Sequence, residues 1–309
     1  MNVLLVAEEA AGIQTLRAIV ATENRLVGVL TTDPSRGGGA TVRGVAEGLG
    51  VETRPSELVR EPDTAEWLRE QDVDVLLNVH SLYVIHHDVV RAPRIGAFNL
   101  HPGPLPEYAG LNAPSWAIYN GEATHGVTVH WMEPEIDTGA VAYTTSFDLT
   151  DGDTGLSVSA RCVREGVPLV ERLLADAAAD PESIPRLQQD LSRRRYYGRR
   201  DVPHEGRVVW SEPAARLAAF VRASDYFPFA SPWGQPRARL GERDVFVLKA
   251  EATGEASDAG PGTVDAVDDG GAARVAAGDE WLLVRRLQAD GAPLAAGEVV
   301  KPGDRLEDG

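Results

Sequence analysis

The chain has 309 residues, enough for two domains of ordinary size, and its 43% hydrophobic and 25% charged residues are typical of a soluble globular protein. Its 30 Lys and Arg against 47 Asp and Glu give a net charge of −17. This balance argues against DNA and anionic membranes as partners, because binding to phosphates needs clustered basic side chains. Cys162 is the only cysteine, so neither an intrachain disulfide nor a cysteine-based zinc site is expected.

The N-terminal segment has no basic stretch followed by a long apolar run, so we expect no signal peptide. No run approaches the roughly 18 apolar residues that a membrane span needs. We therefore expect a soluble, cytoplasmic protein.

Short apolar runs alternate with amphipathic stretches over the first 130 residues. Ile13, Leu16 and Ile19 recur at helical spacing between two such runs. Strands separated by helices predict parallel βαβ units in a Rossmann-like α/β sheet, whose ligands bind beyond the carboxyl ends of the strands. The expected strands cover residues 3–7, 26–30, 73–77, 96–100 and 125–132.

The turn after the first expected strand argues against a dinucleotide site. It reads Glu8-Glu9-Ala10-Ala11-Gly12 and lacks the glycine-rich fingerprint that brings backbone amides onto a pyrophosphate. Its two carboxylates would also repel a phosphate.

The second half of the chain changes character. Residues 154–177 are predicted to form a helix, 181–207 a polar linker and 213–223 a shorter helix. From Arg237 onward, short alternating runs between glycine turns predict a small OB-like β-barrel, with a Gly/Ala/Asp-rich loop at 251–262. We accordingly predict a catalytic domain at residues 1–200 and a barrel domain at 201–309.

Two polar motifs stand where strands are expected to end. Asn99 and His101 alternate on one face of the fourth strand, and a loop stiffened by three prolines follows them. About 35 residues later, Asp137-Thr138-Gly139 follows the fifth strand and a proline turn. Each motif alone could serve strand-end or turn chemistry, but the pairing is specific.

The paired motifs resemble those of the 10-formyltetrahydrofolate-dependent formyltransferases, which include methionyl-tRNA, glycinamide ribonucleotide and sugar N-formyltransferases. The matching elements are Asn99-Leu100-His101, Leu105-Pro106 and Asp137-Thr138-Gly139, with the strand Gly126-Val127-Thr128-Val129 between them. The resemblance covers residues 1–200 strongly and 205–290 more loosely. It implies a Rossmann-like catalytic domain followed by a barrel, with 10-formyltetrahydrofolate as co-substrate.

Formyl transfer explains why these residue types are needed. A primary amine attacks the formyl carbon and creates an oxyanion, which the Asn99 amide or a protonated His101 can stabilise. An imidazole that titrates near neutral pH can move the proton from the amine to the folate nitrogen, and Asp137 would orient that imidazole. The resemblance therefore implies Asn99, His101 and Asp137 as the catalytic residues.

The resemblance places the pterin between two segments and implies no metal. Residues that bind it would do so largely through backbone groups. His80, His86 and His87 match no zinc spacing and lack nearby ligand partners, so we expect no metal site. The implied folate-binding residues are Leu82, Tyr83, Val84, Ile85, Glu133, Pro134, Glu135 and Ile136.

Residues that contact the amine acceptor are expected in the proline loop and in the basic run at 193–200. That run could hold a phosphate, or could be a linker that neutralises an acidic surface. The predicted acceptor-binding residues are Pro104, Leu105, Tyr108, Arg199 and Arg200.

The acceptor itself is expected to be a small molecule or a carrier-bound aminoacyl group. The stretch at 32–43, which matches the basic loop of the tRNA enzyme, has only two arginines, and the region from residue 207 has 12 basic and 17 acidic residues. These features disfavour tRNA. An amino sugar nucleotide, an amino acid and a carrier-bound group stay open, as do a diverged methionyl-tRNA formyltransferase, a formyltetrahydrofolate hydrolase and a non-catalytic folate-binding protein. A homodimer is allowed.

Overall fold

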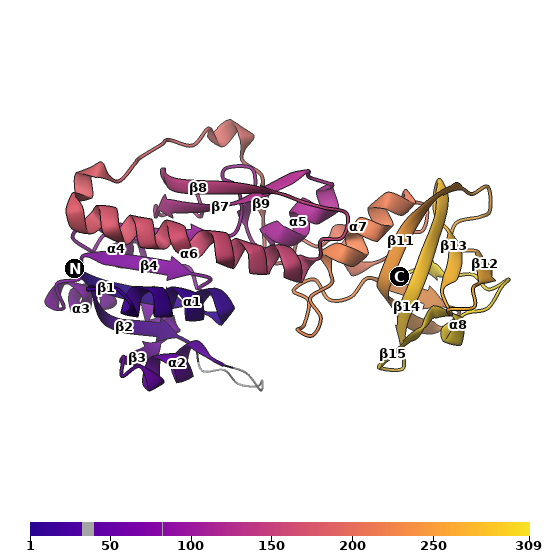
Figure 1. Cartoon of the computed structure of the whole chain (residues 1–309), viewed down its shortest axis with the longest axis horizontal. Coiled ribbons are helices and arrows are strands. Elements are labelled where there is room, and N and C mark those ends of the chain that lie inside the picture. The colour runs from indigo at the N-terminus through magenta and orange to yellow at the C-terminus, as the bar shows by residue number, and fades with distance from the viewer. Residues whose placement is uncertain (33–39, 82) are drawn as a thin grey trace. The chain divides into compact units, whose positions relative to one another are not determined.

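The computed structural model describes residues 1–32, 40–81 and 83–309. The chain forms two compact units (Figure 1). The first comprises residues 1–110, 125–147 and 160–196, and the second comprises 111–124, 148–159 and 197–309. A domain boundary at residue 200 stays a prediction. Among the described residues, no helix is long and apolar enough to cross a membrane.

A seven-stranded sheet forms the centre of the first unit, in the order β3-β2-β1-β4-β5-β7-β8. The five strands from β3 to β5 in this order run parallel to one another, which confirms the Rossmann-like, parallel-rich fold. The strands are β1 (Asn2–Ala7), β2 (Arg25–Thr31), β3 (Thr53–Pro55), β4 (Val75–Val79), β5 (Gly96–His101), β7 (Thr124–Trp131) and β8 (Val141–Asp148). The sequence analysis did not anticipate β3 and β8.

Helices connect the strands and cover the sheet. They are α1 (Glu9–Val20), α2 (Val42–Gly48), α3 (Thr64–Glu70), α4 (His87–Val90) and α6 (Gly155–Ala179), with a 3-10 helix at Ser56–Arg60. Figure 1 shows α6 lying along the sheet. The absence of a side chain at Gly166 allows this helix to pack closely on the sheet. A Cβ at that position would lie only 3.0 Å from Leu100 and 3.1 Å from Val127.

The strand β7 is antiparallel to β5, a direction that the sequence analysis did not predict. The chain leaves β5 at the carboxyl end of the strand, and β7 starts from that same edge of the sheet, without a crossover back to the opposite edge. The register pairs Asn99 with His130 and His101 with Thr128. Polar residues of two distant segments are thereby brought together at one edge.

The turn after β1 is filled by its own carboxylate. Glu8 is buried, and it accepts hydrogen bonds from the Thr31 hydroxyl at 3.1 Å and from the backbone N–H and hydroxyl of Thr32 at 2.8 and 2.9 Å. This side chain ties the end of β1 to the end of β2.

The second unit holds an antiparallel sheet in the order β12-β13-β14-β11-β10-β16, with β15 paired to β14. Its curled form agrees with the predicted OB-like barrel. The strands are β10 (Arg237–Leu240), β11 (Arg243–Ala256), β12 (Val264–Val267), β13 (Ala273–Ala276), β14 (Glu280–Ala289), β15 (Ala292–Ala295) and β16 (Glu307–Asp308). The expected loop at 251–262 is wrong for its first half, because β11 continues to Ala256 by pairing with β14.

The remaining elements are short. Strands β6 (Ala109–Gly110) and β9 (Tyr196–Tyr197) pair with each other. The others are α5 (Ala113–Asn120), α7 (Ala214–Ala223), α8 (Ala296–Val299) and three 3-10 turns at Pro181–Ser183, Leu191–Arg193 and Pro203–Gly206. Helix α7 covers the barrel core with residues such as Leu217 and Val221.

The barrel core should depend strongly on Trp210, which is only 1% exposed. Replacing it with alanine removes a large buried ring, so we expect Trp210→Ala to lower the free energy of unfolding by about 3–5 kcal/mol. Chemical denaturation followed by circular dichroism measures this loss. Leu49→Ala, at a side chain 45% exposed, is the control and should be nearly neutral. A similar cost for both variants would contradict the assignment.

Candidate active site

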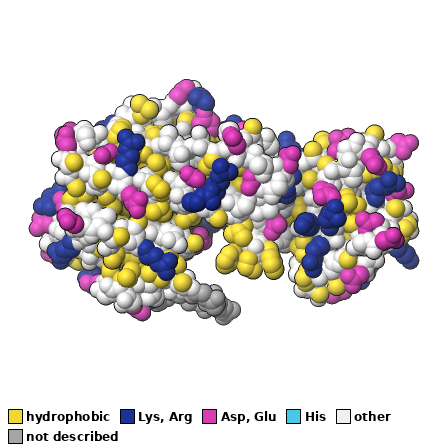
Figure 2. All heavy atoms as spheres, in the orientation of Figure 1, with side chains coloured by type: hydrophobic (Ala, Val, Ile, Leu, Met, Phe, Trp, Pro, Cys, Tyr) yellow, Lys and Arg dark blue, Asp and Glu magenta, His cyan; other side chains and the backbone are white. Residues whose placement is uncertain are grey.

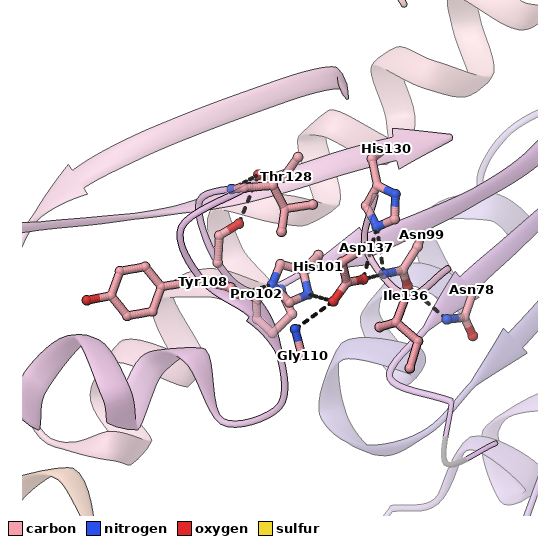
Figure 3. A network of polar contacts seen from close by, with 12 residues as sticks. Asn78, Asn99, His101, Pro102, Tyr108, Gly110, Thr128, His130, Ile136 and Asp137 are labelled. Atoms are coloured by element: carbon pink, nitrogen blue, oxygen red, sulfur yellow. Dashed lines mark hydrogen bonds and ion pairs between the residues drawn. The ribbon is translucent and has the colours of Figure 1, made fainter. Parts of the chain in front are cut away.

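The three predicted catalytic side chains lie together at the carboxyl end of β5 (Figure 3). His101 is 3% exposed, and its Nδ1 lies 3.6 Å from Asp137 Oδ2. Its Nε2 lies 2.6 Å from the carbonyl oxygen of Tyr108. Asn99 Nδ2 lies 3.4 Å from the other oxygen of Asp137. In the neutral ring of His101, Nε2 therefore donates to the Tyr108 carbonyl, and Nδ1, which faces Asp137, is the nitrogen free to take a proton.

Asp137 is buried on the loop that follows β7. Its backbone has φ +57°, in the left-handed region that non-glycine residues rarely adopt. Its Oδ2 accepts a 2.7 Å hydrogen bond from the Gly110 backbone N–H. The neighbouring Gly139 has no room for a side chain, because a Cβ there would clash with the carbonyl oxygen of Trp131.

A fourth residue, His130, was not predicted. Its Nδ1 lies 2.8 Å from the Trp131 carbonyl oxygen, so this nitrogen carries a proton and donates. Nε2 lies 3.0 Å from Asn99 Nδ2 and 3.3 Å from Asp137 Oδ1. It accepts from Asn99 in the neutral ring, and it can donate to Asp137 when the ring is protonated. The alternation of residues 125–132 placed His130 in a strand, but only the antiparallel register shows that it faces Asn99.

Asn78 is a second residue that sequence reasoning did not assign to the site. Its side-chain amide at the end of β4 donates a 2.8 Å hydrogen bond to Asn99 Oδ1. Because the Asn99 oxygen is engaged there, the Asn99 NH₂ faces His130 and Asp137. The orientation of the Asn99 amide is thus set by its neighbours on both sides.

The environment fixes the resting charges of the central pair. Burial lowers the pKa of His101 below its ordinary 6.5, as do nearby His130 and His80, although Asp137 and the Tyr108 carbonyl oppose this shift. Burial pushes the pKa of Asp137 upward, but His101, His130 and the Gly110 N–H outweigh it and hold that pKa well below its usual range. At neutral pH the site therefore holds a neutral imidazole beside a carboxylate.

Two cavities flank the loop that carries Asp137, and they share His87 and Pro134. One, of about 340 Å³, is lined by Val84 and Ile85 among others. The second, of about 280 Å³, is lined by Glu133 and by Val90, Ala97 and Met132, which the sequence analysis did not single out.

The other residues predicted to bind folate are distributed around these cavities. Glu135 and Ile136 are exposed on the same loop as Asp137. Tyr83 is half-buried against the core of the first unit, and Leu82 lies outside the described residues.

The histidines considered for metal binding have local partners. His80 lies 3.5 Å from Glu9. The ligand atoms of His86, His87 and Asp88 lie within 4.8 Å of one another, so Asp88 is a neighbour that the sequence analysis overlooked. His86 Nδ1 already accepts from the Asp88 backbone N–H as the cap of α4.

The predicted acceptor-binding residues fall into two groups. Pro104 and Leu105 are half-buried in the first unit, where the Tyr108 side chain is buried and its carbonyl holds His101. Arg199 and Arg200 are exposed and belong to the second unit. Contact with the acceptor stays a prediction for all five.

Comparison with known proteins identifies the class. Residues 29–173 match the formyl transferase domain, and residues 202–302 match the formyl transferase C-terminal domain. The chain belongs to the formyltransferase family. It is 29% identical over 321 residues to a methionyl-tRNA formyltransferase of Methylobacterium nodulans, a match that covers 100% of this chain and 98% of that protein.

Solved structures share the fold at low sequence identity. The N-formyltransferase of Helicobacter canadensis, in complex with folinic acid and dTDP-3-aminofucose, has a TM-score of 0.69 and 14% identity, over 91% of this chain and 98% of that one. HypX of Aquifex aeolicus in complex with tetrahydrofolic acid has a TM-score of 0.63 and 20% identity, over 96% of this chain and 46% of that one. The chain thus spans about half the length of HypX.

The lowered pKa of His101 predicts a pH dependence of stability. Between its native pKa and the unfolded value near 6.5, the unfolded chain binds more protons, so the free energy of unfolding falls as pH is lowered through this range. His101→Gln removes this contribution, and its slope of unfolding free energy against pH should be smaller by up to about 1.4 kcal/mol per pH unit. Urea titrations at several pH values measure both slopes. Identical slopes would count against a proton-free buried imidazole.

Proposed function

We propose that this formyltransferase moves the formyl group of 10-formyltetrahydrofolate to the primary amine of a small metabolite or a carrier-bound aminoacyl group. The buried network of Asn99, His101 and Asp137 carries the proposal. The family assignment supports formyl transfer, and the folates bound to HypX and to the Helicobacter enzyme support the donor.

The cavities suit the donor in size. Their volumes are about 340 and 280 Å³, close to the lower end of the range of small-molecule sites. Apolar side chains such as Ile85, Val90 and Met132 would pack on a flat ring, and the shared Pro134 is three residues from Asp137. The smaller cavity also reaches Gly96 and Ala97, at the start of the strand that carries Asn99 and His101.

The chemistry follows from the resting charges. The amine nitrogen bonds to the formyl carbon, the bond from that carbon to the folate nitrogen breaks, and one proton passes from the amine to the folate nitrogen. Neutral His101 can take this proton, and the carboxylate of Asp137 at 3.6 Å stabilises the imidazolium that forms. His101 can then return the proton to the leaving nitrogen.

Asn99 would stabilise the oxyanion at the reacting carbon. In this structure its NH₂ contacts His130 and Asp137, so donation to an oxyanion requires one of these contacts to be exchanged. The weaker contact, at 3.4 Å to Asp137, is the one expected to give way.

The charge distribution supports a small acceptor. The region from residue 207 carries 12 basic and 17 acidic residues, a balance of 12 − 17 = −5. Several of its arginines pair with carboxylates, including Arg274 with Asp265 and Arg285 with Glu251. Figure 2 shows basic and acidic side chains interspersed over the visible face of the barrel. A region with this net negative charge disfavours the binding of tRNA phosphates.

Methionyl-tRNA formyltransferase is the second candidate, because the Methylobacterium relative with that name aligns over the whole chain. The stretch at 32–43 matches the basic loop of the tRNA enzyme, and its residues 33–39 lie outside the described residues. The acceptor assay below decides between the two.

Catalytic variants test the roles of the central pair. His101→Ala and Asp137→Asn should each lower turnover by about 100- to 10,000-fold, because each removes part of the proton-transfer pair. Folate binding by calorimetry should be nearly unchanged. His204→Ala and Asp180→Asn, at exposed positions, are matched controls that should keep full activity. Loss of folate binding in step with activity would make the two residues part of the pocket wall instead.

An acceptor assay tests the substrate class. Purified protein, 10-formyltetrahydrofolate and a library of amino sugars, amino acids and carrier-bound aminoacyl groups should yield one product that has gained one formyl group by mass spectrometry. Initiator Met-tRNA, assayed in parallel, should react far more slowly than the best small amine. Equal or faster formylation of Met-tRNA would replace this proposal with the tRNA enzyme.

A further inference from the structure

The loop that carries Asp137 is held from outside by side chains more than 50 residues further along the chain. Gln189 Nε2 donates to the carbonyl oxygens of Asp137 at 3.0 Å and Gly139 at 2.6 Å. Arg194 donates from its guanidinium to the carbonyl oxygen of Ile136 at 2.9 Å. Three backbone carbonyls around the left-handed Asp137 are therefore fixed by two side chains.

The segment that contains Gln189 and Arg194, residues 189–195, also holds the second loop of the site, residues 104–110. The Arg195 N–H donates to the carbonyl of Pro106 at 3.3 Å, and the Ala109 N–H donates to the carbonyl of Arg195 at 3.0 Å. Arg193 forms an ion pair with Glu107. This loop supplies the Tyr108 carbonyl that binds His101 and the Gly110 N–H that binds Asp137.

We infer that residues 189–195 form a brace that couples these two loops, and that Gln189 and Arg194 are positioning residues for the pair of His101 and Asp137. The inference rests on the proposed roles of that pair. It assigns the first three arginines of the basic run to the scaffold of the site: Arg193 contacts Glu107, Arg194 contacts Ile136, and Arg195 lies over the Tyr108 ring at 5.5 Å.

The geometry of Gln189 explains why an amide is required. Its two N–H groups meet two carbonyl oxygens, whereas its own oxygen is buried without a hydrogen-bond partner among the described residues. Turning the amide over would place its oxygen against both carbonyls. Only a side chain with two donors on one atom, at this distance from the backbone, restrains the carbonyls of Asp137 and Gly139 together.

The variant Gln189→Leu tests the brace, because it keeps most of the volume and removes both donors. The matched control is Gln188→Leu, at the exposed neighbouring position. With Asp137 less well placed, kcat should fall by about 10- to 100-fold while KM for the folate changes little. The control should match the wild-type protein.

A titration that needs no substrate separates this inference from the proposed function. The groups that act on His101 are Asp137, the Tyr108 carbonyl, His130 and His80. Burial lowers the pKa of His101, and the attraction between His101 and Asp137 opposes this shift. If the brace holds Asp137 in place, removing the Gln189 amide weakens that attraction, so the pKa of His101 falls further in Gln189→Leu. NMR of histidine-labelled protein, assigned with His101→Ala, measures this shift.

The outcomes are distinct. A His101 titration shifted to lower pH in Gln189→Leu, with wild-type behaviour in Gln188→Leu and a folded spectrum in both, supports the brace even if the acceptor proves to be different. An unchanged His101 titration together with an unchanged kcat would overturn it. Arg194→Lys, which keeps one donor for the Ile136 carbonyl, should retain more activity than Arg194→Met, and equal activities would remove Arg194 from the brace.

Discussion

The site is organised around one buried carboxylate. Asp137 is 8% exposed, and burying an ionised carboxylate is costly unless donors and opposite charge surround it. Here the donors are the Gly110 N–H and the Asn99 amide, with two imidazoles next to them. The position of nearly every polar group in the site follows from satisfying this one charge.

The cost of burying Asp137 also has a use. Because the neighbouring imidazole of His101 is neutral at rest, the full attraction between the two groups appears only when that ring gains a proton. The carboxylate is already in place at that moment, so no solvent or side chain has to rearrange to stabilise the new charge. Under the proposed mechanism the site would thus bind the proton-transfer state better than the resting state.

Much of the fold follows from local patterns, whereas the site is only partly local. Consecutive apolar residues identified β1, β2 and β5, because buried strands need them on both faces, and alternation gave the position of β7. The direction of β7 could not be predicted, since alternation along one strand says nothing about its partner. The motif residues Asn99, His101 and Asp137 could be read from the sequence, but His130 and Asn78 could not, because their roles depend on register across two strand pairs.

The basic run illustrates the same limit for charges. A row of arginines indicates an attraction to anions or carbonyl groups, but it does not show whether these belong to a ligand or to the protein itself. For Arg193 and Arg194 the partners are a glutamate and a backbone carbonyl of the site loops. Nothing in the spacing of the run distinguishes them from Arg199 and Arg200.

The antiparallel pairing of β5 with β7 constrains how this chain can vary. The connection that follows β5 is constrained as well, because its loop at 104–110 supplies the Tyr108 carbonyl to His101 and the Gly110 N–H to Asp137. A slip of a single residue within β7 would turn His130 to the opposite face of the sheet and bring Val129 or Trp131 opposite Asn99. Insertions and deletions in natural or engineered variants should therefore be absent both from this loop and from the eight residues of the strand.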